Sequence, residues 1–156
     1  MPLIKSISGF RGTIGGKADN GLTPIDIVKL TSSFICLIRR SGVSRPRIVV
    51  GRDGRISGTM VNQLVCGNLQ AMGADVIDIG LSTTPTVEVA VTEMKADGGV
   101  ILTASHNPRE WNALKLLNSK GEFISKEDGE WLLEKAAADD YEFSYIDEIG
   151  TYSVEN

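Results

Sequence analysis

The residues best suited to chemistry form a polar loop that directly follows an apolar run. The run occupies 99–102, and the loop after it reads Thr103-Ala104-Ser105-His106-Asn107-Pro108. A short β-branched run, bounded by glycine and by a polar turn that ends in proline, is typical of a buried strand ending in a loop. The loop places the Ser105 hydroxyl beside His106, the only histidine of the chain. A hydroxyl can act as a nucleophile and an imidazole can carry a proton, so this pair indicates a reactive site.

Two interpretations of Ser105 follow from its position. Many serines in turns only hydrogen-bond to nearby backbone groups. The alternative is a nucleophile at the carboxyl end of a strand, where ligands bind in open α/β sheets. Adjacency does not make His106 the base for Ser105, because neighbouring side chains of an extended dipeptide point apart. A serine hydrolase fits worst, since the chain has no Gly-x-Ser-x-Gly motif and its single histidine follows no triad order.

The elements that must position this loop alternate between strands and helices. We expect strands at 47–51, 75–79, 98–102 and 113–117, and helices at 24–41, 57–72, 84–94 and 126–138. Thr23 and Ser125 are the expected N-caps of the first and last helix. Residues 3–16 indicate two short strands around a tight turn. Short connections between alternating strands and helices are typical of a sheet with crossover helices on its faces.

The expected fold is therefore a three-layer α/β/α domain with a mixed, mainly parallel four-stranded sheet. We expect this domain to span 1–140, and 141–156 to be a tail or the start of a linker to another domain. A chain of 156 residues is long enough for one such domain.

Composition and charge exclude several function classes. The formal net charge of −4 does not suit a general nucleic-acid binder, which usually carries a basic face. No segment is apolar over the roughly 18 residues that spanning a membrane requires, and the N-terminus does not resemble a secretory signal. Cys36 and Cys66 lie in apolar helical patterns, which favours reduced core thiols. We expect a cytoplasmic protein with neither a nucleic-acid nor a membrane partner.

The loop at 103–108 resembles the active-site loop of the α-D-phosphohexomutases, the family of phosphoglucomutase, phosphomannomutase and phosphoglucosamine mutase. In that family the serine is a phosphoserine, which donates its phosphoryl group to a hexose phosphate and takes another back from the bisphosphate intermediate. The resemblance implies that Ser105 is the catalytic phosphoryl carrier. It also implies that His106 and Asn107 lie near the phosphate, His106 as a hydrogen-bond donor.

Arg11 and Lys115 are the cations that the resemblance assigns to the same site. Residues 9–12 are similar to the family's Gly-x-Arg-Gly segment, whose arginine faces the phosphoserine, although alone they fit a tight glycine hairpin. A guanidinium can hold two phosphoryl oxygens and stays charged throughout a reaction. Residues 112–115 match the family's Asn-Gly-x-Lys, with Ala113 in place of the glycine. Lys115 would then neutralise phosphoryl charge and assist proton transfer.

The segment 51–57 also has two interpretations. Its Gly51-Arg52-Asp53-Gly54-Arg55 stretch matches the family's Gly-x-Asp-x-Arg segment, which supports the active-site face. On residue types alone, it fits equally well an ion pair between Arg55 and Asp53 that pins a turn.

Taken over the whole chain, the resemblance implies domain I of a four-domain enzyme that interconverts the 1- and 6-phosphates of a hexose. It implies a Mg²⁺ ion that takes one ligand from the phosphate oxygen on Ser105 and the others from a second domain, and a hexose 1,6-bisphosphate as intermediate. The family's metal, sugar and phosphate loops do not occur in this sequence. We therefore expect the isolated chain to be inactive, with the hexose phosphate and the remaining domains as its partners. The alternative is a binding or interaction module that keeps the fold without catalysis.

Overall fold

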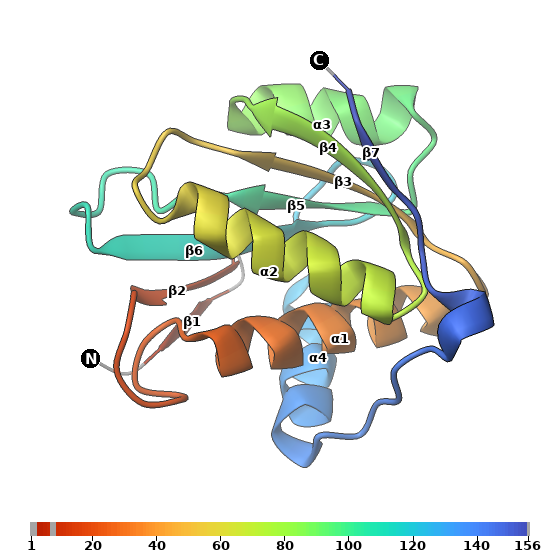
Figure 1. The fold of residues 1–156 in the computed structure, drawn as a ribbon, viewed down its shortest axis with the longest axis horizontal. Helices are drawn as coiled ribbons and strands as arrows, with labels where there is room; N and C mark the ends of the chain where they lie inside the picture. Colours follow the sequence, from red (N-terminus) through yellow and green to blue (C-terminus); the bar gives the residue numbers. More distant parts are fainter. Residues whose placement is uncertain (1–2, 7–8, 156) are drawn as a thin grey trace.

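The computed structural model describes residues 3–6 and 9–155, which form one sheet with helices on both faces (Figure 1). The strands are β1 (Ile4–Ser6), β2 (Gly9–Thr13), β3 (Arg47–Arg52), β4 (Asp75–Leu81), β5 (Gly98–Leu102), β6 (Trp111–Leu117) and β7 (Tyr152–Val154). The helices are α1 (Pro24–Arg40), α2 (Gly58–Ala71), α3 (Thr84–Glu93), α4 (Lys126–Ala138) and the 3₁₀ turn η1 (Ile146–Glu148). The strand order is β1-β2-β6-β5-β3-β4-β7.

The predicted α/β/α architecture is confirmed, but the described residues form seven strands rather than four. The four expected strands are β3 to β6. β1 and β2 are the two short strands expected within residues 3–16, and they belong to the same sheet. The tight turn expected between them lies outside the described residues. β7 comes from the segment expected to be a tail, and its three residues are all exposed, so no apolar pattern marks it. With these strands included, β1–β2, β2–β6 and β5–β6 pair antiparallel, whereas β3–β4, β3–β5 and β4–β7 pair parallel.

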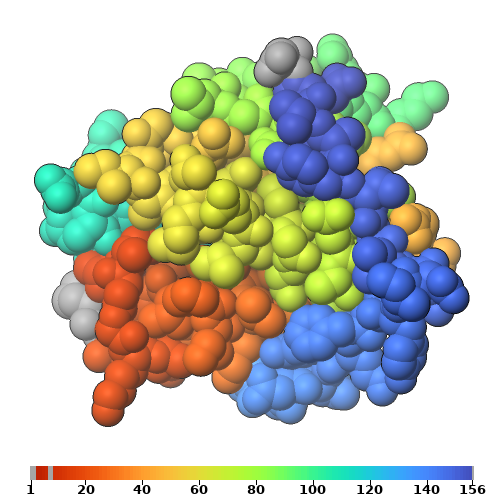
Figure 2. Space-filling view, in the orientation of Figure 1, coloured from red at the N-terminus to blue at the C-terminus, as the bar shows by residue number. Residues whose placement is uncertain are grey.

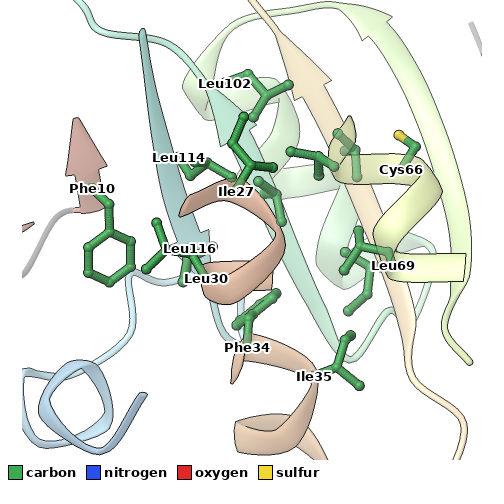
Figure 3. Packing of buried hydrophobic residues seen from close by; sticks show 14 of the residues in the cluster. Phe10, Ile27, Leu30, Phe34, Ile35, Cys66, Leu69, Leu102, Leu114 and Leu116 are labelled. Atoms are coloured by element: carbon green, nitrogen blue, oxygen red, sulfur yellow. The ribbon is translucent and has the colours of Figure 1, made fainter. Parts of the chain in front are cut away.

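The core lies mainly between the sheet and the layer of α1 and α2. Ile27, Leu30 and Phe34 recur at helical spacing on α1 and are buried against Leu114 and Leu116 of β6 (Figure 3). α4 packs on α1 from the same side, whereas α3 covers the opposite face of the sheet with a smaller apolar cluster. Both faces are covered, which explains why the central strands are almost continuously apolar.

The predicted caps fix where the first and last helices begin. Thr23 and Asp26 form a capping box at α1, in which each side chain bonds the backbone N–H of the other, and Pro24 stands in the first turn. At α4 the Ser125 side chain accepts a hydrogen bond from the N–H of Asp128. Both helices therefore start where the sequence predicts.

The path of the chain through the sheet creates a crevice at its carboxyl edge. From β3 the chain passes through α2 to β4 on one side of β3, and then through α3 to β5 on the other side. α2 and α3 lie on opposite faces, so β3 and β5 flank a topological switch point, where open α/β sheets bind ligands. The loop with Asp53 and Arg55 follows β3, and the loop with Ser105 follows β5.

The C-terminal segment lies on the surface of the molecule (Figure 2), where β7 pairs with β4 at the edge of the sheet. The Tyr152 hydroxyl donates a 2.6 Å hydrogen bond to the Asp78 carboxylate of β4, which also accepts from Asn62 and from the Gly80 N–H. Burial raises the pKa of Asp78, but these hydrogen bonds outweigh it, and the net pKa is below its ordinary value. The bond to Asp78 raises the pKa of Tyr152 to about 12.

Replacing Tyr152 with phenylalanine should lower the free energy of unfolding by about 1 kcal/mol, since the lost hydrogen bond is only partly buried. A group whose pKa is raised by folding stabilises the protein below its unfolded pKa and loses that effect as pH rises through the folded value. The stability difference between wild type and Tyr152→Phe should therefore shrink as the pH rises from about 10 to about 12. Denaturant unfolding at pH 8 and at alkaline pH measures this, and an unchanged difference would contradict it.

Candidate functional site

A small cavity joins the Ser105 loop to the N-terminal hairpin and to β6. Its volume is about 60 Å³, and it is lined by Ser6, Gly9, Arg11, Thr103, Ala104, Ser105, Ala113 and Lys115. Its lining combines two cationic side chains with small polar groups, which suits a compact anionic group. A larger cavity of about 550 Å³ lies between α1 and α4 and contains none of the predicted site residues. Here the chemistry of the lining, rather than the size of the cavity, points to the site.

Strand register explains how Arg11 and Lys115 reach the same cavity. Arg11 of β2 lies opposite Ala113 of β6, and Lys115 follows two residues further along β6. Because side chains alternate along a strand and directly paired residues share a face, Arg11, Ala113 and Lys115 all project from one face of the sheet. Both cations thus border Ser105 although they are far apart in the sequence.

Ser105 is held in an uncommon conformation with its hydroxyl next to Lys115. The Lys115 Nζ donates to the Ser105 Oγ at 2.9 Å. The Ser105 backbone has a φ of 53°, in the left-handed region that non-glycine residues seldom occupy. The Ser105 N–H donates to the Thr103 Oγ1, and the Asn107 N–H donates to the Ala104 carbonyl, which closes a tight turn around the serine. The side chain is exposed, so its hydroxyl is accessible.

Arg11 supplies a positive charge that no neighbouring acid neutralises. Its side chain is exposed and forms no hydrogen bond or ion pair with any residue that the structure describes. Among the described acids, none lines the cavity. An anion bonded to Ser105 would therefore lie between two cationic side chains, the arrangement that favours phosphoryl recognition.

The other predicted residues of the loop do not line this cavity. His106 is exposed and has no hydrogen-bond partner within the described part of the chain. The Asn107 side chain is half-buried, and only its backbone N–H is hydrogen-bonded. Arg109 is also exposed and lies outside the cavity. The structure thus brings together Ser105, Arg11 and Lys115, and leaves His106 and Asn107 on the outer side of the loop.

Arg55 contacts the Ser105 loop and was not among the predicted site residues. Its guanidinium forms an ion pair with Asp53 at 3.2 Å and also donates to the main-chain carbonyl of Ser105 at 2.7 Å. Arg55 therefore forms the ion pair with Asp53 that one interpretation of segment 51–57 expects. It also contacts the loop that carries Ser105, which fits the other interpretation. The sequence feature that points to Arg55 is its position just after β3, in a loop that lies beside the loop after β5.

The described residues do not by themselves form a magnesium site. No group of three or more histidine, cysteine, aspartate or glutamate side chains gathers in the part of the chain that the structure describes. Mg²⁺ is held by carboxylates together with water and substrate phosphates. A phosphate on Ser105 would contribute one oxygen, and the surrounding Lys115 and Arg11 would attract that phosphate rather than a cation.

Comparisons with known proteins show the family of this chain. The profile of the family described as phosphoglucomutase/phosphomannomutase, alpha/beta/alpha domain I, matches residues 4–143. A phosphoglucomutase/phosphomannomutase of Thermococcus kodakarensis is 40% identical over 141 residues, which is 89% of this chain and 31% of the relative. A phosphoglucosamine mutase of Nautilia profundicola is 37% identical over 142 residues, again 89% of this chain and 31% of the relative. The chain thus spans about a third of the length of the curated relatives it matches.

A solved structure shares the fold. A phosphoglucomutase/phosphomannomutase family protein of Burkholderia thailandensis superimposes with a TM-score of 0.79 at 24% identity. The superposition covers 98% of this chain and 34% of that one.

None of the helices in the described residues is long and apolar enough to span a membrane.

Proposed function

This chain belongs to the phosphoglucomutase/phosphomannomutase family, as its α/β/α domain I, and on that premise we propose that Ser105 carries the transferred phosphoryl group. The full-length protein would interconvert the 1- and 6-phosphates of glucose, mannose or glucosamine, with the hexose 1,6-bisphosphate as intermediate. The relatives that match this chain are named as mutases acting on such hexoses. The observation that carries the proposal is the hydrogen bond from Lys115 to the Ser105 hydroxyl, in a cavity that Arg11 also borders.

The charges around Ser105 suit a phosphoserine. Phosphoserine carries about −1.5 to −2 charges at neutral pH. Phosphoryl transfer depends mostly on positioning and on neutralising the charge that spreads over the transferred oxygens. Lys115 and Arg11 provide two positive charges at the cavity, and the left-handed turn presents the serine oxygen to solvent. These features favour a phosphoryl carrier over a serine that only closes a turn.

Lys115 is placed to move the proton in each half-reaction. When phosphoserine transfers its phosphoryl group, the sugar hydroxyl oxygen bonds to phosphorus and gives its proton to a base that solvent or another domain would supply, while the bond from phosphorus to the serine oxygen breaks. The Lys115 ammonium lies within hydrogen-bond distance of the serine oxygen and would protonate it, leaving a neutral amine. In the return step the serine oxygen attacks the other phosphorus of the bisphosphate and the amine takes its proton, while the departing sugar oxygen takes a proton back from the protonated base. The lysine therefore ends the cycle as it began.

Mg²⁺ belongs to the same proposal as a group that neutralises phosphoryl charge when bound. The chain would hold it only through a phosphate oxygen on Ser105, because the described residues contain no cluster of metal ligands. The remaining ligands, and the residues that select the sugar, would come from other domains of the full-length protein.

Peptide mapping tests the proposal directly. The full-length protein is incubated with glucose 1,6-bisphosphate and the phosphorylated peptide is identified by mass spectrometry. We expect phosphate on Ser105. Phosphate on Ser57 or Ser82 instead, both near the same edge of the sheet, would overturn the assignment. A protein that takes up no phosphate would favour the alternative of a non-catalytic module.

The isolated chain of 156 residues should fold but show no mutase turnover. The reason is that its described residues offer no cluster of metal ligands, and that the sequence does not contain the family's sugar loop. A coupled assay with glucose 1-phosphate and with mannose 1-phosphate measures turnover, and circular dichroism confirms folding. Sustained, metal-dependent conversion by the pure chain would show that its site is complete.

A further inference from the structure

The Arg55 guanidinium connects three main-chain carbonyls of the loop that carries Ser105. Nη2 donates to the Ser105 carbonyl at 2.7 Å, and Nη1 donates to the carbonyls of Pro108 at 2.8 Å and Trp111 at 3.2 Å. These three acceptors lie at the start of the loop, near its middle and at its junction with β6. One side chain from the neighbouring loop therefore fixes the path of the whole segment from Ser105 to β6.

The Arg55 side chain is itself held in place. Its Nε donates to Asp53 Oδ2 at 3.2 Å, and the Asp53 Oδ1 accepts from the Arg55 backbone N–H. The Asp53 N–H in turn donates to the Leu102 carbonyl at the end of β5. Four of the five N–H groups of a guanidinium are thus used. The Arg55 side chain is only 12% exposed, and little of it remains to bind a substrate.

A second contact ties the same two loops together. The Asn112 side chain, which is fully buried, donates to the Ser57 hydroxyl at 2.9 Å and accepts from the Ala113 N–H. It joins the beginning of β6 to the residue before α2. The loop after β3 is therefore rigidly attached on both sides of Arg55.

We propose that Arg55 is a positioning residue, which sets the direction of the Ser105 hydroxyl by fixing the Ser105 carbonyl; this inference rests on the proposed function of Ser105. Serine at a φ of 53° is strained, and such a conformation persists only where surrounding contacts determine it. The carbonyl bond to Arg55 fixes the peptide plane after Ser105, while Lys115 holds the hydroxyl on the other side. Together the two bonds define where the serine oxygen points.

The variant Arg55→Lys distinguishes a positioning role of Arg55 from a role of its positive charge. Arg55→Lys keeps the positive charge, but a single ammonium cannot reproduce a planar fork that reaches three carbonyls and a carboxylate. The matched control is Arg47→Lys. The Arg47 guanidinium also donates to a main-chain carbonyl, that of Met94, but it lies at the start of β3, away from Ser105.

The test measures single-turnover phosphorylation of Ser105 in the full-length protein over a range of glucose 1,6-bisphosphate concentrations. We expect Arg55→Lys to lower the maximal rate by on the order of 10²-fold, as a reacting group misplaced by about 1 Å would. The half-saturating concentration should stay within about twofold of wild type, because Arg55 does not bind the bisphosphate. Arg47→Lys should leave both values unchanged. A second variant, Asp53→Asn, serves where Arg55→Lys does not fold. It leaves the carbonyl contacts of Arg55 but weakens the ion pair, and it should lower the maximal rate by about tenfold.

Several results would overturn the positioning role. One is a wild-type maximal rate in a folded Arg55→Lys or, where that variant does not fold, in Asp53→Asn. Another is a higher half-saturating concentration at an unchanged maximal rate, which would make Arg55 a substrate-binding residue. A wild-type protein that takes up no phosphate on Ser105 would instead contradict the proposed function, so the two failures can be told apart.

Discussion

Replacing Ser105 with alanine should abolish phosphoryl uptake from glucose 1,6-bisphosphate and lower mutase turnover of the full-length protein by on the order of 10⁶-fold, as loss of a covalent nucleophile does. Among the described residues, those with a hydroxyl that line the cavity are Ser6, Thr103 and Ser105. The Ser105 Oγ is the one bonded to Lys115, whereas Thr103 Oγ1 already accepts from the Ser105 N–H. Intact-mass measurement and a coupled assay record the two effects.

Folding should be almost unaffected by this change, which separates chemistry from stability. The Ser105 side chain is exposed, and alanine is no more strained than serine at a φ of 53°. Ser105→Gly is a useful companion, since glycine adopts this backbone without strain. It should be equally inactive and unfold at a temperature no lower than wild type. Ser119→Ala, in the exposed turn after β6, should keep full activity. Residual phosphorylation of Ser105→Ala would mean that another residue carries the phosphoryl group.

The central part of the fold was predictable because its elements are defined by apolar patterns. α1 shows helical spacing at Ile27, Leu30 and Phe34, and these side chains are the ones buried on the sheet. β3 and β5 are short apolar runs that end in polar loops, as buried parallel strands do. The sequence pattern therefore predicts β1 to β6 and all four α-helices.

The edge strand β7 was not predictable from a local apolar pattern. β7 is bound to β4 by backbone hydrogen bonds and by the contact of Tyr152 with Asp78. Its side chains are exposed, so no apolar alternation marks it. The chain is instead guided to this edge by Gly150, whose backbone bonds the carbonyl and side chain of Gln70 at the end of α2. Such contacts depend on tertiary proximity, which a local pattern does not contain.

The candidate site was also only partly predictable from the sequence. Motif resemblance pointed to Ser105, Arg11 and Lys115, and the antiparallel pairing of β2 with β6 explains how the two cations come to one cavity. The motif match places Arg55 at the active-site face, but its individual contacts were not predictable, because its acceptors beyond Asp53 are main-chain carbonyls. Every residue has a carbonyl, so residue types do not tell which one an arginine binds. The chemistry of His106 predicts a role in the site, yet this residue lies in the turn between β5 and β6 and does not line the cavity.

Removing the positive charge of Lys115 should lower kcat of the full-length protein by roughly 10²- to 10³-fold, the range measured when one preorganised donor is lost from a charged transition state. Lys115→Met keeps the apolar stem and removes the only nitrogen bonded to the Ser105 Oγ among the described residues. The leaving oxygen then lacks both its proton donor and its nearest cation. Lys120→Met, in an exposed turn away from the cavity, is the matched control and should leave kcat unchanged.

Arg11→Met should lower kcat in the same range, because the Arg11 guanidinium has no partner within the described residues and its charge remains available for the phosphate. Among the described residues Arg11 forms no hydrogen bond with the Ser105 hydroxyl, so its loss should remove charge neutralisation but not the proton donor. The double variant should lose less than the sum of the two free-energy effects, since both cations act on one phosphoryl group. Additive losses would show that the two side chains act at separate places and would contradict a common phosphate between them.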